Sequence, residues 1–134
     1  MILSDFIDWH DSIKTQIGKV TSLTIKPLSD EPELMIKQLE EVEAWNTRVG
    51  FLLAEANGWL DKASMELRPP KSEEASEADR RASLECSVSP VRVVRDKLES
   101  LAGCIKQRLI LGESLLAYHR QFSEHKGVDA HVRG

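Results

Sequence analysis

The sequence has few cysteines and no long apolar run. Only Cys86 and Cys104 are cysteines among its 134 residues. Two cysteines are too few for the disulfide framework of a small secreted domain, so we expect a reducing, cytoplasmic compartment. No stretch reaches the roughly 20 apolar residues of a membrane span, and the first residues lack the basic and apolar parts of a signal peptide. We therefore expect no membrane partner.

Patterns of a catalytic or cofactor-binding site are also missing. The sequence has no P-loop, no glycine-rich dinucleotide turn and no nucleophile elbow. Its four histidines have no metal-ligand spacing with one another or with the cysteines. Acidic pairs such as Glu40 and Glu41 are expected on solvated surfaces, where nothing gives a carboxylate acid–base character. We expect a protein without enzymatic activity, cofactor, metal or small-molecule substrate.

Charge is unevenly spread, although the net charge of −4 does not favour a uniformly basic protein. Residues 29–67 contain nine acidic and three basic residues, whereas residues 90–126 contain seven basic and four acidic residues. Two interpretations follow. The two segments pair within one molecule and partly neutralise each other, or the second presents a basic face to an anionic partner.

Three segments repeat apolar residues at helical spacing. Residues 3–19 predict a first helix with Ser4 as a cap, and the β-branched stretch 20–25 predicts an extended connector or short strand. A second helix is expected over 31–67, with Asp30 as its N-cap, and its apolar residues form heptad columns. Ser89 and Pro90 predict the start of a third helix over 90–125. A polar loop over 68–88 and a flexible tail over 127–134 complete the chain.

These elements predict a single all-α domain of residues 1–134. Two long helices of similar length joined by a loop favour a coiled-coil-like antiparallel hairpin, and the N-terminal helix packs on it. Cys104 falls among apolar positions of the third helix and is expected to be buried. The apolar face of that helix is wider than one partner helix covers, so we expect a homo-oligomer.

Two sets of residues are candidates for binding. Tryptophan is enriched at interface hot spots, and a polar residue in an apolar column can fix the oligomeric state. The alternatives are that the tryptophans fill the core between the helices and that the column is exposed at the polar residue. The candidate oligomer or partner interface contains Trp45, Asn46, Leu52, Trp59, Leu109 and Leu116. The basic residues near the loop form the candidate nucleic-acid site, because repetition around a ring would produce a basic rim for phosphates. They are Lys62, Arg68, Lys71, Arg80 and Arg81.

Four segments carry a resemblance to a known family: the long helix that ends in Leu60-Asp61-Lys62-Ala63, the polar basic loop after it, the segment 91–101, and the segment 115–120. In these segments the chain resembles phage recombination mediators of the UvsY type. It covers roughly residues 31–122 and implies a ring of helical protomers. It also implies binding of single-stranded DNA and assistance in loading a recombinase onto strands coated by a single-strand-binding protein. The host compartment would be the cytoplasm of a bacterium. The alternative is a helical protein–protein interaction module, such as a phage-encoded inhibitor or assembly factor.

Overall fold

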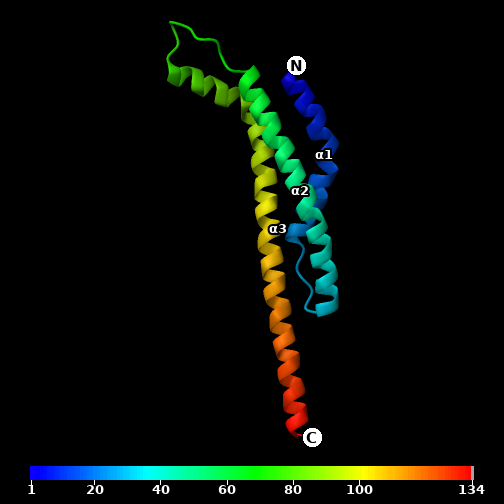
Figure 1. Ribbon diagram of the computed structural model, residues 1–134. Coiled ribbons are helices and arrows are strands. Elements are labelled where there is room, and N and C mark those ends of the chain that lie inside the picture. Colours follow the sequence, from blue (N-terminus) through cyan, green and yellow to red (C-terminus); the bar gives the residue numbers. More distant parts are fainter. Residues whose placement is uncertain (134) are drawn as a thin grey trace.

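The computed structural model describes the backbone of residues 1–133 and the side chains of residues 1–122. It contains three helices, α1 (Ile2–Ile25), α2 (Pro32–Glu66) and α3 (Glu77–Arg133), and the described residues contain no strand. α2 and α3 lie side by side as the predicted hairpin, and α1 packs against both (Figure 1). The all-α fold class is therefore confirmed.

α1 covers the half of the hairpin nearer the connecting loop. Its start lies beside the end of α2, because the rings of Phe6 and Trp59 are 6.2 Å apart. Its end lies beside the middle of α3, where the Arg108 guanidinium donates a hydrogen bond to the Thr24 carbonyl at 3.1 Å. α1 is thus antiparallel to α2 and parallel to α3. The other half of the hairpin has no third helix over it (Figure 1).

Heptad columns of α2 and α3 form the core between the helices. On α2 the buried column is Val42, Val49, Ala56 and Ala63. On α3 it includes Val91, Leu98 and Ile105, of which Leu98 is completely buried. These columns were predicted from their spacing of seven residues. Burial of a Val, Leu or Ile side chain contributes roughly 1.5–3 kcal/mol, so these columns supply much of the stability of the hairpin.

Close approach of α2 and α3 continues beyond the end of α1. A Cβ atom built on Gly112 would lie 2.3 Å from the nearer methyl carbon of Leu39. Leu39 therefore occupies the space that any larger residue at position 112 would need. Glycine at this position keeps the two helices close where only two helices remain.

Among the described side chains, no ion pair joins the two helices of the hairpin. Among the side chains of residues 1–122, each ion pair lies within α1 or within α3, as with Arg95 and Glu99 at 3.2 Å. The acidic surface of α2 is therefore not neutralised by ion pairs to α3 in this part of the chain. Apolar packing, rather than charge pairing, holds the hairpin.

The first helix is longer than predicted. Residues 20–25 continue α1 instead of forming a connector or strand, because Val20 is 1% exposed and packs in the core. Tertiary packing here overrides the preference of β-branched residues for strands. The hydroxyl of Thr21 donates a hydrogen bond to the Ile17 carbonyl, which lets a β-branched polar residue remain in the helix.

The second helix agrees with the prediction to within one residue at each end. Its cap residue is Glu31 rather than Asp30, and it makes no side-chain capping bond. The preceding loop is instead fixed by Gln38, whose amide accepts a hydrogen bond from the Ser29 backbone and donates one to the Pro27 carbonyl. These bonds place the start of α2 at Pro32.

The third helix begins at Glu77, so the prediction of a polar loop over 68–88 and a start at Pro90 was wrong. Ser76 and Asp79 form a capping box: the Asp79 amide donates to the Ser76 hydroxyl, and the Ser76 amide donates to the Asp79 carboxylate. Pro90 lies inside the helix, where it lacks an amide proton and crowds the carbonyl of Cys86. The first turns of α3 are accordingly bent away from the axis of the rest of the helix (Figure 1).

At its other end α3 continues to Arg133, beyond the predicted end at 125, and the predicted tail over 127–133 is helical. Gly127 does not end the helix, since no glycine in the described backbone has a positive φ and no proline follows. Gly134, and the side chains of His125 and His131, lie outside the described residues. This end of α3 extends past the start of α2 (Figure 1).

One column of α3 faces solvent. Cys104, expected to be buried, is exposed, and so are Leu111 (54%) and Tyr118 (63%), each seven residues further on. Their column points away from the seam with α2, because two buried columns of α3 already fill that seam; these are Val91, Leu98 and Ile105, and Val94 and Leu101. Within the described residues, no helix combines the length and the apolar character needed to cross a membrane.

Candidate nucleic-acid interface

Four predicted basic residues gather around one hollow at the loop end of the hairpin. The hollow has a volume of about 370 Å³ and lies between the loop after α2 and the first turns of α3. Arg68 and Lys71 reach it from the loop, and Arg80 and Arg81 reach it from α3. Residues from both sides of the loop therefore form one site, which we call the basic pocket. Its lining consists of Arg68, Pro69, Lys71, Glu77, Arg80, Arg81 and Leu84.

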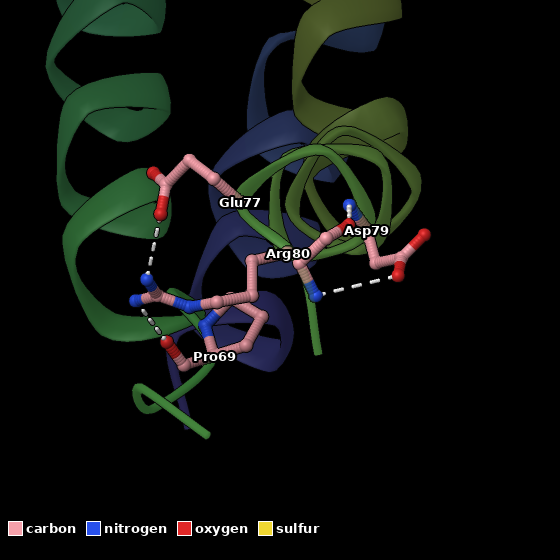
Figure 2. Close-up of polar contacts among 5 residues, drawn as sticks. Pro69, Glu77, Asp79 and Arg80 are labelled. Carbon is pink, nitrogen blue, oxygen red and sulfur yellow. Dashed lines mark hydrogen bonds and ion pairs between the residues drawn. The ribbon is translucent and has the colours of Figure 1, made fainter. Parts of the chain in front are cut away.

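Arg80 connects the two sides of the basic pocket. Figure 2 shows its guanidinium between Glu77 and Pro69. Nη1 donates to the Glu77 carboxylate at 3.0 Å, and Nη2 donates to the Pro69 carbonyl at 2.9 Å. The Arg80 side chain is only 14% exposed, whereas that of Glu77 is 72% exposed. Arg80 therefore holds the loop on α3 and is the most fixed cation of the pocket.

Acidic residues of the same stretch are mostly directed elsewhere. Glu77 is the only carboxylate in the lining of the basic pocket. Asp79 is engaged in the capping box with Ser76. Glu73 lines a neighbouring hollow, and Glu74 lines neither hollow. The loop is close to neutral in sequence, but its fold presents four cations and one carboxylate to the pocket.

Lys62 does not belong to the basic pocket. Its ammonium nitrogen lies 5.6 Å from the ring centroid of Trp59 on α2, in a cation–π contact. The five predicted basic residues therefore separate into a group of four and a single lysine. A site on Lys62 would be distinct from one at the pocket.

The tryptophans of the predicted interface are half-buried against the core. Trp59 packs with Phe6 and Trp9 at centroid distances of 6.2 and 6.1 Å, so it fills space between α1 and α2. Trp9, which the sequence did not single out, also donates a hydrogen bond from its indole to Glu55 at 2.6 Å. Trp45 lines an open hollow between α1 and α2. Much of each tryptophan surface therefore serves the bundle itself.

Leu52 was wrongly assigned to the interface, because it is 0% exposed in the core between the helices. Asn46, Leu109 and Leu116 are half-buried, and Leu109 also packs on the core. The exposed apolar surface of α3 instead includes Leu111 and other residues that the prediction did not include. Those residues are Val93, Ile110, Tyr118 and Phe122, the last of which stacks on Tyr118.

Two residues beside the basic pocket carried a signal in the sequence. Ser76 and Asp79 have the spacing of a capping box, which marks a helix start thirteen residues before Ser89. Once α3 is extended to that start, Glu77 joins the pocket beside Arg80 and Arg81. Pro69 had no such signal, because its role depends on where the loop carbonyl lies in the folded chain.

No protein-family model, curated protein or solved structure matches this chain. Among the described residues, no three His, Cys, Asp or Glu side chains are grouped to hold a metal ion.

Proposed function

We propose that the protein is a non-enzymatic recombination mediator of the phage type. In this proposal it binds single-stranded DNA as a helical oligomer and assists the loading of a recombinase onto strands held by a single-strand-binding protein. The observation that carries the proposal is the basic pocket, where Arg68, Lys71, Arg80 and Arg81 line one hollow with a single carboxylate. The bacterial cytoplasm would be its place of action.

Electrostatics supports a phosphate-bearing ligand at this end of the molecule. Arginine donates in a planar fork that matches phosphate oxygens, and lysine adds a compact positive charge. Three of the four cations, Arg68, Lys71 and Arg81, are exposed, so a strand can reach them without rearrangement of the core. A pocket of about 370 Å³ has room for one or two phosphates but not for a duplex. A flexible single strand can place its phosphates in such a pocket, so the pocket favours single-stranded DNA.

Self-association is supported by the exposed column of α3. A chain that leaves Leu111 and Tyr118 more than half exposed has apolar surface that a second copy can cover. Each copy added to an assembly brings another basic pocket, and several pockets on one strand raise the overall affinity by effective concentration. Oligomerisation would thus compensate for the small number of cations in one protomer.

Binding is tested by fluorescence anisotropy of a labelled oligothymidine at low and moderate salt. We expect binding that weakens steeply with salt, because the logarithm of the affinity falls by roughly 0.7 per phosphate neutralised for each tenfold rise in salt. A duplex of the same length should bind more weakly. Absence of binding at both salt concentrations would overturn the proposal.

Charge reversal locates the binding site. The quadruple variant with Glu at Arg68, Lys71, Arg80 and Arg81 should lose binding. A matched control reverses four exposed lysines away from the pocket and changes the net charge by the same amount; these are Lys19, Lys37, Lys97 and Lys106. If both variants lose affinity equally, the effect is one of overall charge and the pocket is not the site.

A second candidate is a helical protein–protein interaction module, which the exposed column of α3 favours. In this case the protein would act as a phage-encoded inhibitor or assembly factor. Leu111→Glu should then abolish capture of the partner without loss of helicity, since the side chain is 54% exposed. Trp59→Ala is less informative, because Trp59 packs on Phe6 and Trp9. Native mass spectrometry distinguishes the candidates: the mediator should form a closed oligomer that Leu111→Glu dissociates, whereas a module would be monomeric.

A further inference from the structure

We infer that the Glu77 carboxylate occupies the binding position of a phosphate in the basic pocket. A phosphodiester of the bound strand replaces Glu77 on the Arg80 guanidinium, while Arg80 keeps its hydrogen bond to Pro69. The inference rests on the proposed function, because it identifies the atoms that would hold the strand. Glu77 is then an internal competitor that lowers the affinity of the free protein for anions.

Contact geometry is the first argument. Glu77 Oε2 lies 3.0 Å from Nη1 of Arg80, inside the hollow that three further cations line. A carboxylate oxygen and a phosphate oxygen make the same charge-assisted hydrogen bond to a guanidinium. The carboxylate therefore marks where an anion is held. Nε of Arg80 is buried and has no acceptor among the described residues, so the guanidinium has a donor left over.

Unequal burial of the two partners is the second argument. The Arg80 side chain is 14% exposed and is held at Nη2 by the Pro69 carbonyl, so it stays in place when Nη1 changes partner. The Glu77 side chain is 72% exposed and can rotate into solvent. An i,i+3 ion pair whose carboxylate is exposed to water contributes little to stability, so its replacement by a phosphate costs little.

The neighbouring cations are the third argument. Arg68, Lys71 and Arg81 line the same hollow, and no acidic residue besides Glu77 lines it. A phosphate on Arg80 would attract all three, whereas Glu77 is tethered to the backbone beside Arg80. Departure of Glu77 also removes the one carboxylate from the lining of the basic pocket.

The test compares Glu77→Gln with Glu74→Gln in the oligothymidine anisotropy assay, using the full chain. Both variants remove one negative charge from the same segment, but only Glu77 lines the basic pocket. We expect Glu77→Gln to bind about fivefold more tightly than the wild type, the factor expected for one partly screened charge interaction. Glu74→Gln should stay within about twofold of the wild type, the effect of a screened charge outside the pocket. Thermal unfolding of both variants checks that the helix start is intact.

Arg80→Lys provides the converse test. Lysine keeps the charge but cannot hold the Pro69 carbonyl and a phosphate in one planar fork, so we expect about fivefold weaker binding. Equal affinities of Glu77→Gln and Glu74→Gln, with binding by the wild type, would overturn this inference and leave the proposed function standing. Binding by Glu77→Gln but not by the wild type would support the inference and overturn the proposed function for the native protein. No binding by any variant would overturn both.

Discussion

Replacement of Gly112 by alanine tests the closest approach of α2 and α3. The added methyl group would lie 2.3 and 2.6 Å from the two methyl carbons of Leu39 and 2.9 Å from its Cγ. Because Cγ is included, rotation of the end of the side chain does not relieve the overlap, and the whole Leu39 side chain or the helix must move. Overpacking of this kind costs about 1–3 kcal/mol. Alanine gains about 1 kcal/mol of helix propensity over glycine, so we expect the variant to range from neutral to about 2 kcal/mol less stable.

Gly103 is the matched control on the same helix. A Cβ built on Gly103 meets no atom within 4 Å, so Gly103→Ala should receive only the helix-propensity gain of about 1 kcal/mol. Urea unfolding followed by circular dichroism at one protein concentration measures the difference. We expect Gly112→Ala to be about 1–3 kcal/mol less stable than Gly103→Ala, which is the overpacking cost alone. Equal stabilisation of both variants would refute the packing of Leu39 on Gly112.

A double variant identifies the partner of the new methyl group. Leu39→Ala alone should destabilise the protein by about 2–5 kcal/mol, the usual cost of truncating a buried leucine. Combined with Gly112→Ala, its cost should be smaller, because the alanine at position 112 then fills part of the space that Leu39 leaves. A coupling energy below about 0.5 kcal/mol would show that the two residues do not meet.

Three further predictions concern the helix start, the proline and a histidine. Ser76→Ala should remove one capping bond, destabilise the protein by about 1 kcal/mol and increase hydrogen exchange in the first turns of α3. Pro90→Ala should raise stability but weaken oligonucleotide binding, because a straighter α3 moves Arg80 away from Pro69; unchanged binding would show that the pocket does not depend on the bend. The pKa of His10 is lowered from its ordinary value of 6.5, chiefly by burial and also by Lys14, so the unfolded chain protonates first. The contribution of neutral His10 to the free energy of unfolding should therefore be complete above about pH 6.5 and decrease as the pH falls below it. His10→Gln should flatten the pH dependence of the urea midpoint.

The hairpin was predictable from the sequence because its core repeats every seven residues. The column Val42, Val49, Ala56 and Ala63 has one spacing throughout, and that spacing alone indicates a long amphipathic helix. The end of α1 was not predictable in this way. Val20 belongs to a β-branched stretch, and only the burial of Val20 against the hairpin decides in favour of helix.

The basic pocket was predictable in composition but not in arrangement. The sequence indicates which basic residues lie near the loop, but their grouping depends on where α3 begins and on how it bends. Pro90 after Ser89 is a strong helix-start signal, and it concealed the weaker capping box of Ser76 and Asp79. The sequence also did not indicate that Lys62 lies outside the basic pocket. That depends on the direction of its side chain, which contacts the Trp59 ring on α2.

The contact between Arg80 and Pro69 also bears on how the chain folds. These two residues are 11 positions apart, whereas Leu39 and Gly112 close a far longer stretch of chain. Closing a short loop loses less conformational entropy, so the hairpin is expected to nucleate at the turn and to zip toward the open end. The turn that carries the basic pocket would then both nucleate folding and bind the ligand, so the same residues would be constrained by both roles. Substitutions there should change the folding rate, while those around Gly112 should mainly change the unfolding rate.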